Sequence, residues 1–200
     1  MLLNRHVYRP EDVACTYCTK VRTCKKGGSN RTVCPWLQER LEAGVVNYAE
    51  LMLSLLSPSC PISCKRISDL ILSYSGSMFS KNRHLLSFNW LKSNIPLEQW
   101  DTNKNLAVAY LLSSTPTLSD YAQDCVLSNV LRRPMRPEIR RVSQNEIAII
   151  EAVYRLIGQS EYTRLDDLLD DERVDMTTTR LIAHAMLIAR YGLDVLKVEE

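Results

Sequence analysis

The chain has 200 residues, of which 46% are hydrophobic and 24% are charged, and its formal net charge is +2. This composition is typical of a folded globular protein and excludes the disordered and fibrous classes. No apolar run approaches the roughly 18 residues that a membrane-spanning helix needs. The basic amino terminus is not followed by an apolar block, so we expect no secretory signal and a cytoplasmic location.

Four of the seven cysteines lie within the first 34 residues, in the pattern C-x2-C-x5-C-x9-C formed by Cys15, Cys18, Cys24 and Cys34. An odd number of cysteines without a secretory signal argues against a disulfide framework. The spacing of the first two lets one turn aim both sulfurs at one ion, and the Gly27-Gly28 pair lets the chain reverse toward them. We therefore predict a closed Zn²⁺ site with four thiolates, which forms a metal-binding knuckle over residues 1–35.

An iron–sulfur cluster is the alternative cofactor. The C-x2-C-x5-C spacing resembles the iron–sulfur segments of the endonuclease III and Cas4 nuclease families, and Cys34-Pro35 resembles iron–sulfur loops. Those families place the fourth cysteine differently, and their nuclease motifs are missing from this sequence. The resemblance implies a 4Fe-4S cluster in place of zinc. Cys60 and Cys64 could supply ligands if Cys24 or Cys34 does not, and Cys125 is expected to pack in the core.

The rest of the chain predicts a mainly α-helical fold, because apolar residues recur every three or four positions. Ser119 is a candidate N-cap, Ser143-x-x-Glu146 forms a capping box, and Gly192 is a candidate C-cap. The expected elements, in chain order, are 36–56, 67–74 (a helix or a strand), 85–91, 103–113, a helix after Ser119, 146–157, a short helix after Thr163, and 177–191.

A linker is expected over residues 132–142. Positions 132–141 hold five arginines and two prolines but one acidic residue. Neither a long helix nor a central strand tolerates two such prolines. We therefore predict a helical body over 36–131 and a separate carboxy-terminal helical unit over 143–200.

The charge is unevenly distributed along the chain. Residues 1–41 hold eight Lys or Arg and three acidic residues, whereas residues 151–200 hold six and eleven. Two basic segments, one of them around the cysteines, favour contact with nucleic-acid phosphates. The same cations could instead balance the thiolates or keep the linker solvated. The candidate nucleic-acid-binding residues are Lys20, Arg22, Lys25, Lys26, Arg31, Arg132, Arg133, Arg136, Arg140 and Arg141.

The acidic carboxy-terminal part points to a different kind of partner. Residues 163–191 have the outline of a helix-turn-helix, but its first helix carries Asp166, Asp167, Asp170 and Asp171, which would repel a duplex. A protein-interaction module that docks through these helices, or that imitates the charge of nucleic acid to inhibit a host nucleoprotein, is therefore the alternative function.

Catalytic signals are weak. The chain has three histidines, His6, His84 and His184. We expect His84 at the surface beside its basic neighbours and His184 buried in the last helix. The sequence lacks a nucleophile elbow, a phosphate-binding glycine loop and an H-E-x-x-H motif, which favours a non-enzymatic protein.

Two stretches, NKNLAVAYLL at 103–112 and AHAMLIARYGL at 183–193, resemble uncharacterised small proteins carried on mobile genetic elements of Gram-positive gut bacteria. The resemblance implies a cytoplasmic accessory protein of a phage, plasmid or conjugative element. Such genes often encode regulators or inhibitors of host defence nucleases. The sequence as a whole thus predicts a zinc-stabilised, non-enzymatic binding protein whose partner is nucleic acid or a nucleoprotein complex.

Overall fold

The computed structural model describes residues 37–44, 46–55, 61–94, 103–127, 142–157 and 174–198, and these are mainly helical, with no β-strand among them. The predicted mainly α class is confirmed for this part of the chain, whereas the predicted knuckle over 1–35 lies outside it. None of the described helices combines the length and apolarity needed to cross a bilayer. The helices are α1 (Leu37–Glu42), α2 (Tyr48–Leu53), α3 (Pro61–Leu72), α4 (Asn82–Asn94), α5 (Asn103–Leu112), α6 (Pro116–Leu127), α7 (Gln144–Ile157), α8 (Met176–Tyr191) and the 3-10 helix η4 (Gly192–Lys197).

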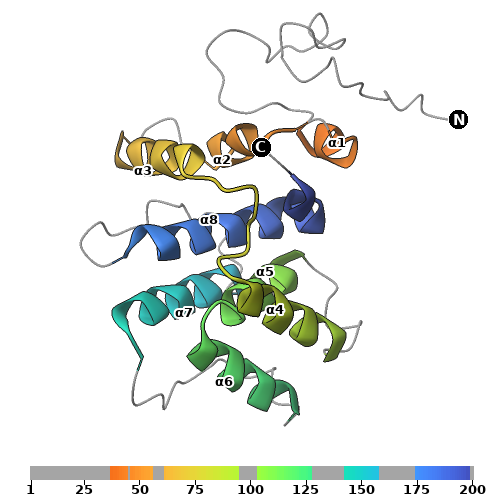
Figure 1. Cartoon of the computed structure of the whole chain (residues 1–200), viewed down its shortest axis with the longest axis vertical. Coiled ribbons are helices and arrows are strands. Elements are labelled where there is room, and N and C mark those ends of the chain that lie inside the picture. The colour runs from red at the N-terminus through yellow and green to blue at the C-terminus, as the bar shows by residue number, and fades with distance from the viewer. Residues whose placement is uncertain are drawn as a thin grey trace, which may run out of the picture.

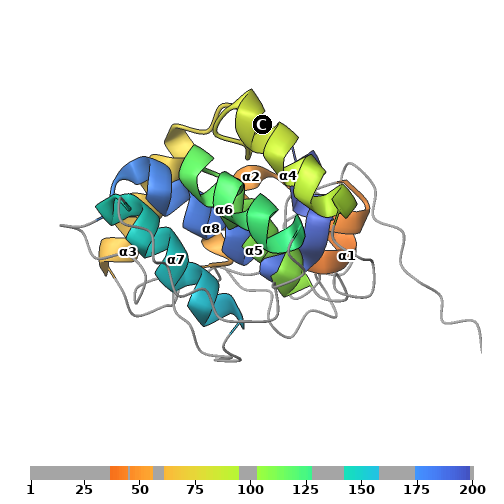
Figure 2. The same cartoon turned by 90° about the horizontal axis from the view of Figure 1, so that it is seen from below.

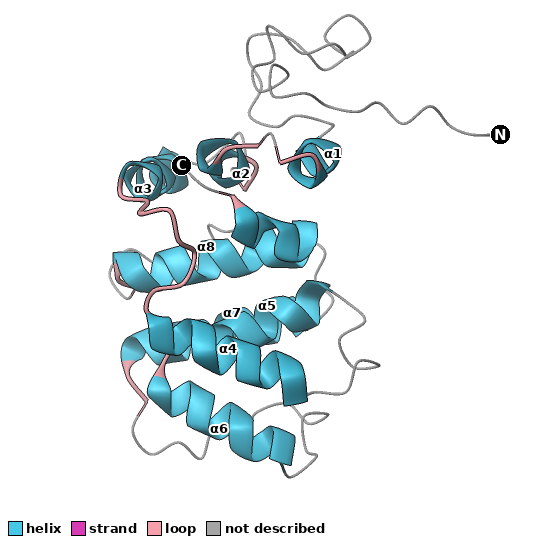
Figure 3. Cartoon of the chain, turned by 45° about the vertical axis from the view of Figure 1, so that its right-hand side comes forward, coloured by secondary structure: helices cyan, strands magenta, loops and turns pink. Residues whose placement is uncertain are grey.

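Helix α8 lies at the centre of the body. Figure 1 shows α1, α2 and α3 on one side of it and α5 and α7 on the other, with α4 and α6 farther out. The contacts agree, because α8 packs against α5, α7, α2, α3 and η4. The turned view in Figure 3 shows the same layers. Helices α2, α3, α5 and α7 therefore pack directly on α8, whereas α4 and α6 pack on α5.

The ends of α8 follow local signals in the sequence. The Asp175 side chain accepts a hydrogen bond from the backbone N–H of Thr178 at 2.7 Å and caps the first turn. Gly192 ends the helix with φ +77°, a left-handed value that favours glycine, and a Cβ there would lie 3.1 Å from the side-chain oxygen of Asn103. The prediction of a helix over 177–191 ended by Gly192 is thus confirmed, with one added residue at the start.

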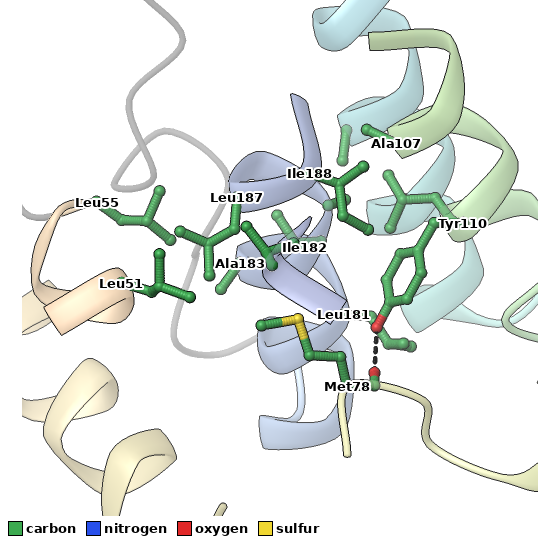
Figure 4. Close-up of a cluster of buried hydrophobic side chains, with 14 of the residues drawn as sticks. Leu51, Leu55, Met78, Ala107, Tyr110, Leu181, Ile182, Ala183, Leu187 and Ile188 are labelled. Atoms are coloured by element: carbon green, nitrogen blue, oxygen red, sulfur yellow. Dashed lines mark hydrogen bonds between the residues drawn. The ribbon is translucent and has the colours of Figure 1, made fainter. Parts of the chain in front are cut away.

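One hydrophobic core joins the helices on both sides of the predicted linker. Leu51, Leu111, Ile149 and Ile182, from α2, α5, α7 and α8, are almost fully buried and belong to the same cluster. In Figure 4, α8 side chains point both toward α2 and toward α5. Residues 128–141, which include most of the predicted linker, lie outside the described residues.

The prediction of a single helix over 36–56 is wrong, because the structure has two helices there, α1 and α2. Gly44 has φ +71°, which interrupts the helix, and Asn47 starts α2 through a capping box with Glu50. The buried Arg40 of α1 holds the same Glu50 carboxylate with two hydrogen bonds of 2.7 and 3.1 Å. The apolar spacing continues across the break, so periodicity alone did not reveal it.

Other helix boundaries test the predicted caps. The Ser143–Glu146 capping box is confirmed, with Ser143 donating to Glu146 through its N–H and its hydroxyl, both at 2.9 Å. Thr115 also donates to this carboxylate at 2.9 Å and ties α7 to the start of α6. Ser119 is not an N-cap but a buried residue inside α6, since the Thr115 hydroxyl accepts from Leu118 N–H and the helix begins at Pro116. The segment 67–74 is largely helix α3 rather than a strand.

Candidate functional site

The predicted metal and nucleic-acid residues lie mostly outside the part of the chain that the structure describes. Residues 1–36 and 128–141 contain Cys15, Cys18, Cys24 and Cys34 and all ten candidate nucleic-acid-binding residues, and the short helix predicted after Thr163 is also outside. Cys64 and Cys125 belong to α3 and α6. Within the described ranges, no three His, Cys, Asp or Glu side chains gather where they could hold a metal ion.

The most organised polar group among the described residues is a buried cluster around His184 of α8. The ring is fully buried, and its Nδ1 lies 3.1 Å from the carbonyl oxygen of Met78. A carbonyl oxygen only accepts, so Nδ1 carries the proton and Nε2 is left as an acceptor. The Tyr48 hydroxyl lies 2.7 Å from Nε2 and therefore donates to it. Both ring nitrogens are thus satisfied, as predicted for a buried His184.

Tyr110 of α5 completes this cluster from the other side of α8. Its hydroxyl donates to the same Met78 carbonyl oxygen (Figure 4) and lies 3.2 Å from His184 Nδ1. Met78 belongs to the connection between α3 and α4. Its carbonyl oxygen accepts from two helices, from Tyr110 of α5 and from His184 of α8. The cluster therefore joins α2, α5 and α8 to one short segment.

His84 of α4 is a second buried histidine, and the prediction that it lies at the surface is wrong. Its Nε2 donates to the carbonyl oxygen of Tyr110 at 2.9 Å, while its Nδ1 faces the N–H of Ser80 at 3.4 Å. The ring also packs against Phe79, with ring centroids 5.0 Å apart. The basic neighbours Lys81 and Arg83 are exposed to solvent, whereas the packing of α4 on α5 buries the His84 imidazole.

Two tyrosines stack at the other end of the cluster. The rings of Tyr48 and Tyr74 lie 3.6 Å apart between centroids and are almost parallel. Tyr74 donates to the carbonyl oxygen of Val198 at 3.0 Å and so fastens the end of η4. The Arg180 guanidinium of α8 donates to the hydroxyl of Ser73 at 2.7 Å, next to Tyr74 in the chain. Together with the bond from His184 to Met78, these contacts hold residues 73–78 against α8, α2 and η4.

Burial sets the protonation states of this cluster. Desolvation lowers the pKa of His184 to about 3, helped by the nearby Arg180 charge, and lowers the pKa of His84 to about 4. Desolvation also raises the pKa of the Tyr110 and Tyr48 hydroxyls, and Arg180 partly opposes this shift. At neutral pH all four groups are uncharged.

The chemistry of the cluster is that of a structural network. A general base or nucleophile must reach a substrate and must change protonation state near the working pH. The two imidazoles are buried, neutral and bonded on both nitrogens, and the two hydroxyls point at them or at a backbone carbonyl. The arrangement joins the layers on the two sides of α8.

Sequence reasoning found one member of the cluster and missed the others. His184 stood out because it lies between two alanines on an apolar face. Tyr48 and Tyr110 were not among the candidate residues, because nothing local indicated that Tyr48 would meet a residue 136 positions away or that Tyr110 would meet one 74 positions away.

Comparison with known proteins adds no relative. No protein-family model matches the chain, and no curated protein or solved structure is significantly similar to it.

Proposed function

We propose that this chain is a non-enzymatic, metal-stabilised binding protein that contacts nucleic acid or a nucleoprotein complex through its amino-terminal segment. The observation that supports this is the sequence of residues 15–34, where four cysteines at metal-ligand spacing are interspersed with Lys20, Arg22, Lys25, Lys26 and Arg31. A loop tied to Zn²⁺ would hold these cations in fixed positions, and fixed cations bind phosphates by displacing counterions.

The charges of the helical body support this assignment, because four of its arginines are used to join elements of the fold. Arg40 holds Glu50, and Arg66 donates to the hydroxyl of Thr179 at 2.8 Å. Arg190 donates to the carbonyl oxygen of Ser54 at 2.6 Å, and Arg180 to Ser73. Cations used to join helices are poor candidates for binding a polyanion. The basic segments at 15–34 and 132–141 are the better candidates.

The test is a charge reversal with a matched control. Lys25→Glu/Lys26→Glu should weaken binding of a labelled mixed-sequence oligonucleotide at least about tenfold and reduce the salt slope by about 2, one for each phosphate that the chain no longer neutralises. The control is Lys92→Glu/Lys104→Glu, which makes the same charge change at exposed positions of α4 and α5. Fluorescence anisotropy at several salt concentrations gives both quantities. Equal affinity for the two double variants would remove the proposal.

The alternative is a protein-interaction module that acts through the acidic carboxy-terminal part. Six of the twelve residues 161–172 are acidic, which suits a basic protein surface rather than a nucleic acid. Pull-down from lysate with and without nuclease treatment separates the two. Nucleic-acid contact predicts that co-purifying material disappears after nuclease treatment, and a directly bound protein would persist. A brown preparation would indicate an iron–sulfur cluster instead of zinc.

A further inference from the structure

The outward face of α7 exposes three large apolar side chains in one row. Ile147, Tyr154 and Ile157 are 40%, 37% and 56% exposed. Ile147 and Tyr154 are seven residues apart and lie on the same side of the helix, and Ile157, three residues further on, lies where this side borders the buried Val153. Other strongly exposed apolar residues in the described ranges, such as Leu72 of α3 and Leu86 of α4, lie on separate helices. The row on α7 is therefore the most extended apolar face that the described helices present.

The opposite side of α7 is fully used by the core. Ile149 and Val153 are buried, and α7 packs against α5 and α8. In the view from below, α7 runs along one edge of the body (Figure 2). A helix with apolar residues on both faces at the edge of a body is typical of a contact surface.

Two charged residues make this face complementary to itself. Glu151 and Arg155 are exposed, four residues apart, and neither takes part in an ion pair within the described chain. Two copies of α7 placed antiparallel about a two-fold axis near Val153 bring Glu151 of each copy opposite Arg155 of the other. In the same register Ile147 of one copy lies within one helical turn of Ile157 of the other, and the two Tyr154 rings lie near the axis. Such self-complementarity is the property of an isologous interface.

We propose that the outward face of α7 is a self-association surface, which pairs antiparallel with α7 of a second copy of this chain. One pair of helices of 14 residues is about 21 Å long and covers less than the roughly 1,200 Å² of a standard stable interface. The dimer is therefore weak and forms with rising concentration. It would carry two amino-terminal segments in one particle, which raises the avidity for a partner with repeated sites.

Sedimentation equilibrium of the full chain, under a reductant that excludes disulfide-linked species, tests the pairing by charge exchange. Glu151→Arg alone and Arg155→Glu alone should each weaken self-association about tenfold, because each places like charges opposite each other twice. The double variant Glu151→Arg/Arg155→Glu should restore the affinity to within about threefold of the parent. Asp69→Arg, at an exposed position of α3, is the charge control and should change nothing.

A second variant keeps the test independent of charge. Ile157→Ser removes apolar area from the most exposed member of the row and should weaken the dimer, whereas Leu72→Ser, at a residue 85% exposed, should not. Circular dichroism checks that each variant is folded. A chain that stays monomeric up to about 1 mM would overturn the proposal. The partner of this face would then be residues 158–173 or another protein. A dimer that Glu151→Arg leaves intact, or that the double exchange fails to restore, would also overturn it.

Discussion

The helical body and the amino-terminal segment, residues 1–36, rely on different kinds of side chain. The body buries large apolar residues such as Leu51, Leu70 and Ile182 and closes two histidines inside the same core. The sequence of the segment has a smaller share of large apolar residues than the body, together with four cysteines and a cluster of cations. Apolar burial stabilises the first, and metal binding is the stabilisation that we propose for the second. Damage to one region should therefore leave the properties of the other intact.

Removal of the central imidazole should damage the body most. His184→Ala leaves the Tyr48 hydroxyl without its acceptor and opens a cavity beside Met78, so we expect a loss of about 3 to 5 kcal/mol in the free energy of unfolding. Urea unfolding followed by circular dichroism measures it. Tyr74→Phe, which removes one hydrogen bond from a partly buried hydroxyl, should cost about 1 kcal/mol or less. A similar small loss for both variants would contradict the role given to the cluster.

Acid should weaken the body next most strongly. The folded chain keeps His184 and His84 neutral down to pKa values of about 3 and about 4, whereas both bind protons near pH 6.5 once unfolded. The unfolded state therefore gains protons as the pH falls below 6.5, and stability should drop by about 4 kcal/mol between pH 7.5 and 5, about 2 kcal/mol for each histidine.

The buried Glu146 carboxylate does not obscure this acid effect. Hydrogen bonds from Ser143 and Thr115 outweigh the effect of burial and lower the pKa of Glu146 below its usual value. Its contribution to stability therefore disappears only at lower pH. Urea unfolding at several pH values makes the measurement, and a flat profile from pH 7.5 to 5 would show that the histidines titrate normally in the folded chain.

The cap of α8 should have a smaller effect. Asp175→Ala removes the bond to Thr178 and a 2.7 Å bond from Asn145 of α7, with an expected loss of about 1 kcal/mol. Asp194→Ala, which breaks an exposed pair with Lys197, is the control and should change stability by less than about 0.5 kcal/mol. Thermal unfolding of the two variants measures the difference, and equal unfolding midpoints for Asp175→Ala and Asp194→Ala would mean that the cap does not stabilise the fold.

Chelation should have the smallest effect on the body. Removal of bound metal should leave the midpoint of urea unfolding unchanged, because none of the described core contacts of the body involves the predicted metal-binding cysteines. The same treatment should abolish oligonucleotide binding. Anisotropy and circular dichroism on the same chelated sample check both halves. Loss of helical signal on chelation would show that the two regions fold together.

Local signals predicted the fold well where a cap decides the structure. Gly192 and the Ser143–Glu146 pair act on backbone groups within three or four residues, so the start of α7 and the end of α8 could be predicted, whereas the Asp175 cap of α8 was not among the predictions. The break at Gly44 was missed because the apolar spacing continues through it. The Asn47-x-x-Glu50 pattern was the available signal that a new helix begins.

Long-range packing explains what could not be predicted. The surface position expected for His84 rested on its charged neighbours, whereas its burial depends on α5, 26 residues further along at Tyr110. The pairing of Tyr48 with His184 likewise spans 136 residues. No periodicity within one helix carries that information, so the cluster became visible only in three dimensions.

Metal content is the most direct test of the account. Elemental analysis of the chain purified anaerobically, beside Cys18→Ser, should find about one zinc ion per chain in the parent and almost none in the variant, since four thiolates close a single tetrahedral site. Both proteins should show the same helical signal. A parent chain that binds no metal, or a variant that retains a full complement, would contradict the account.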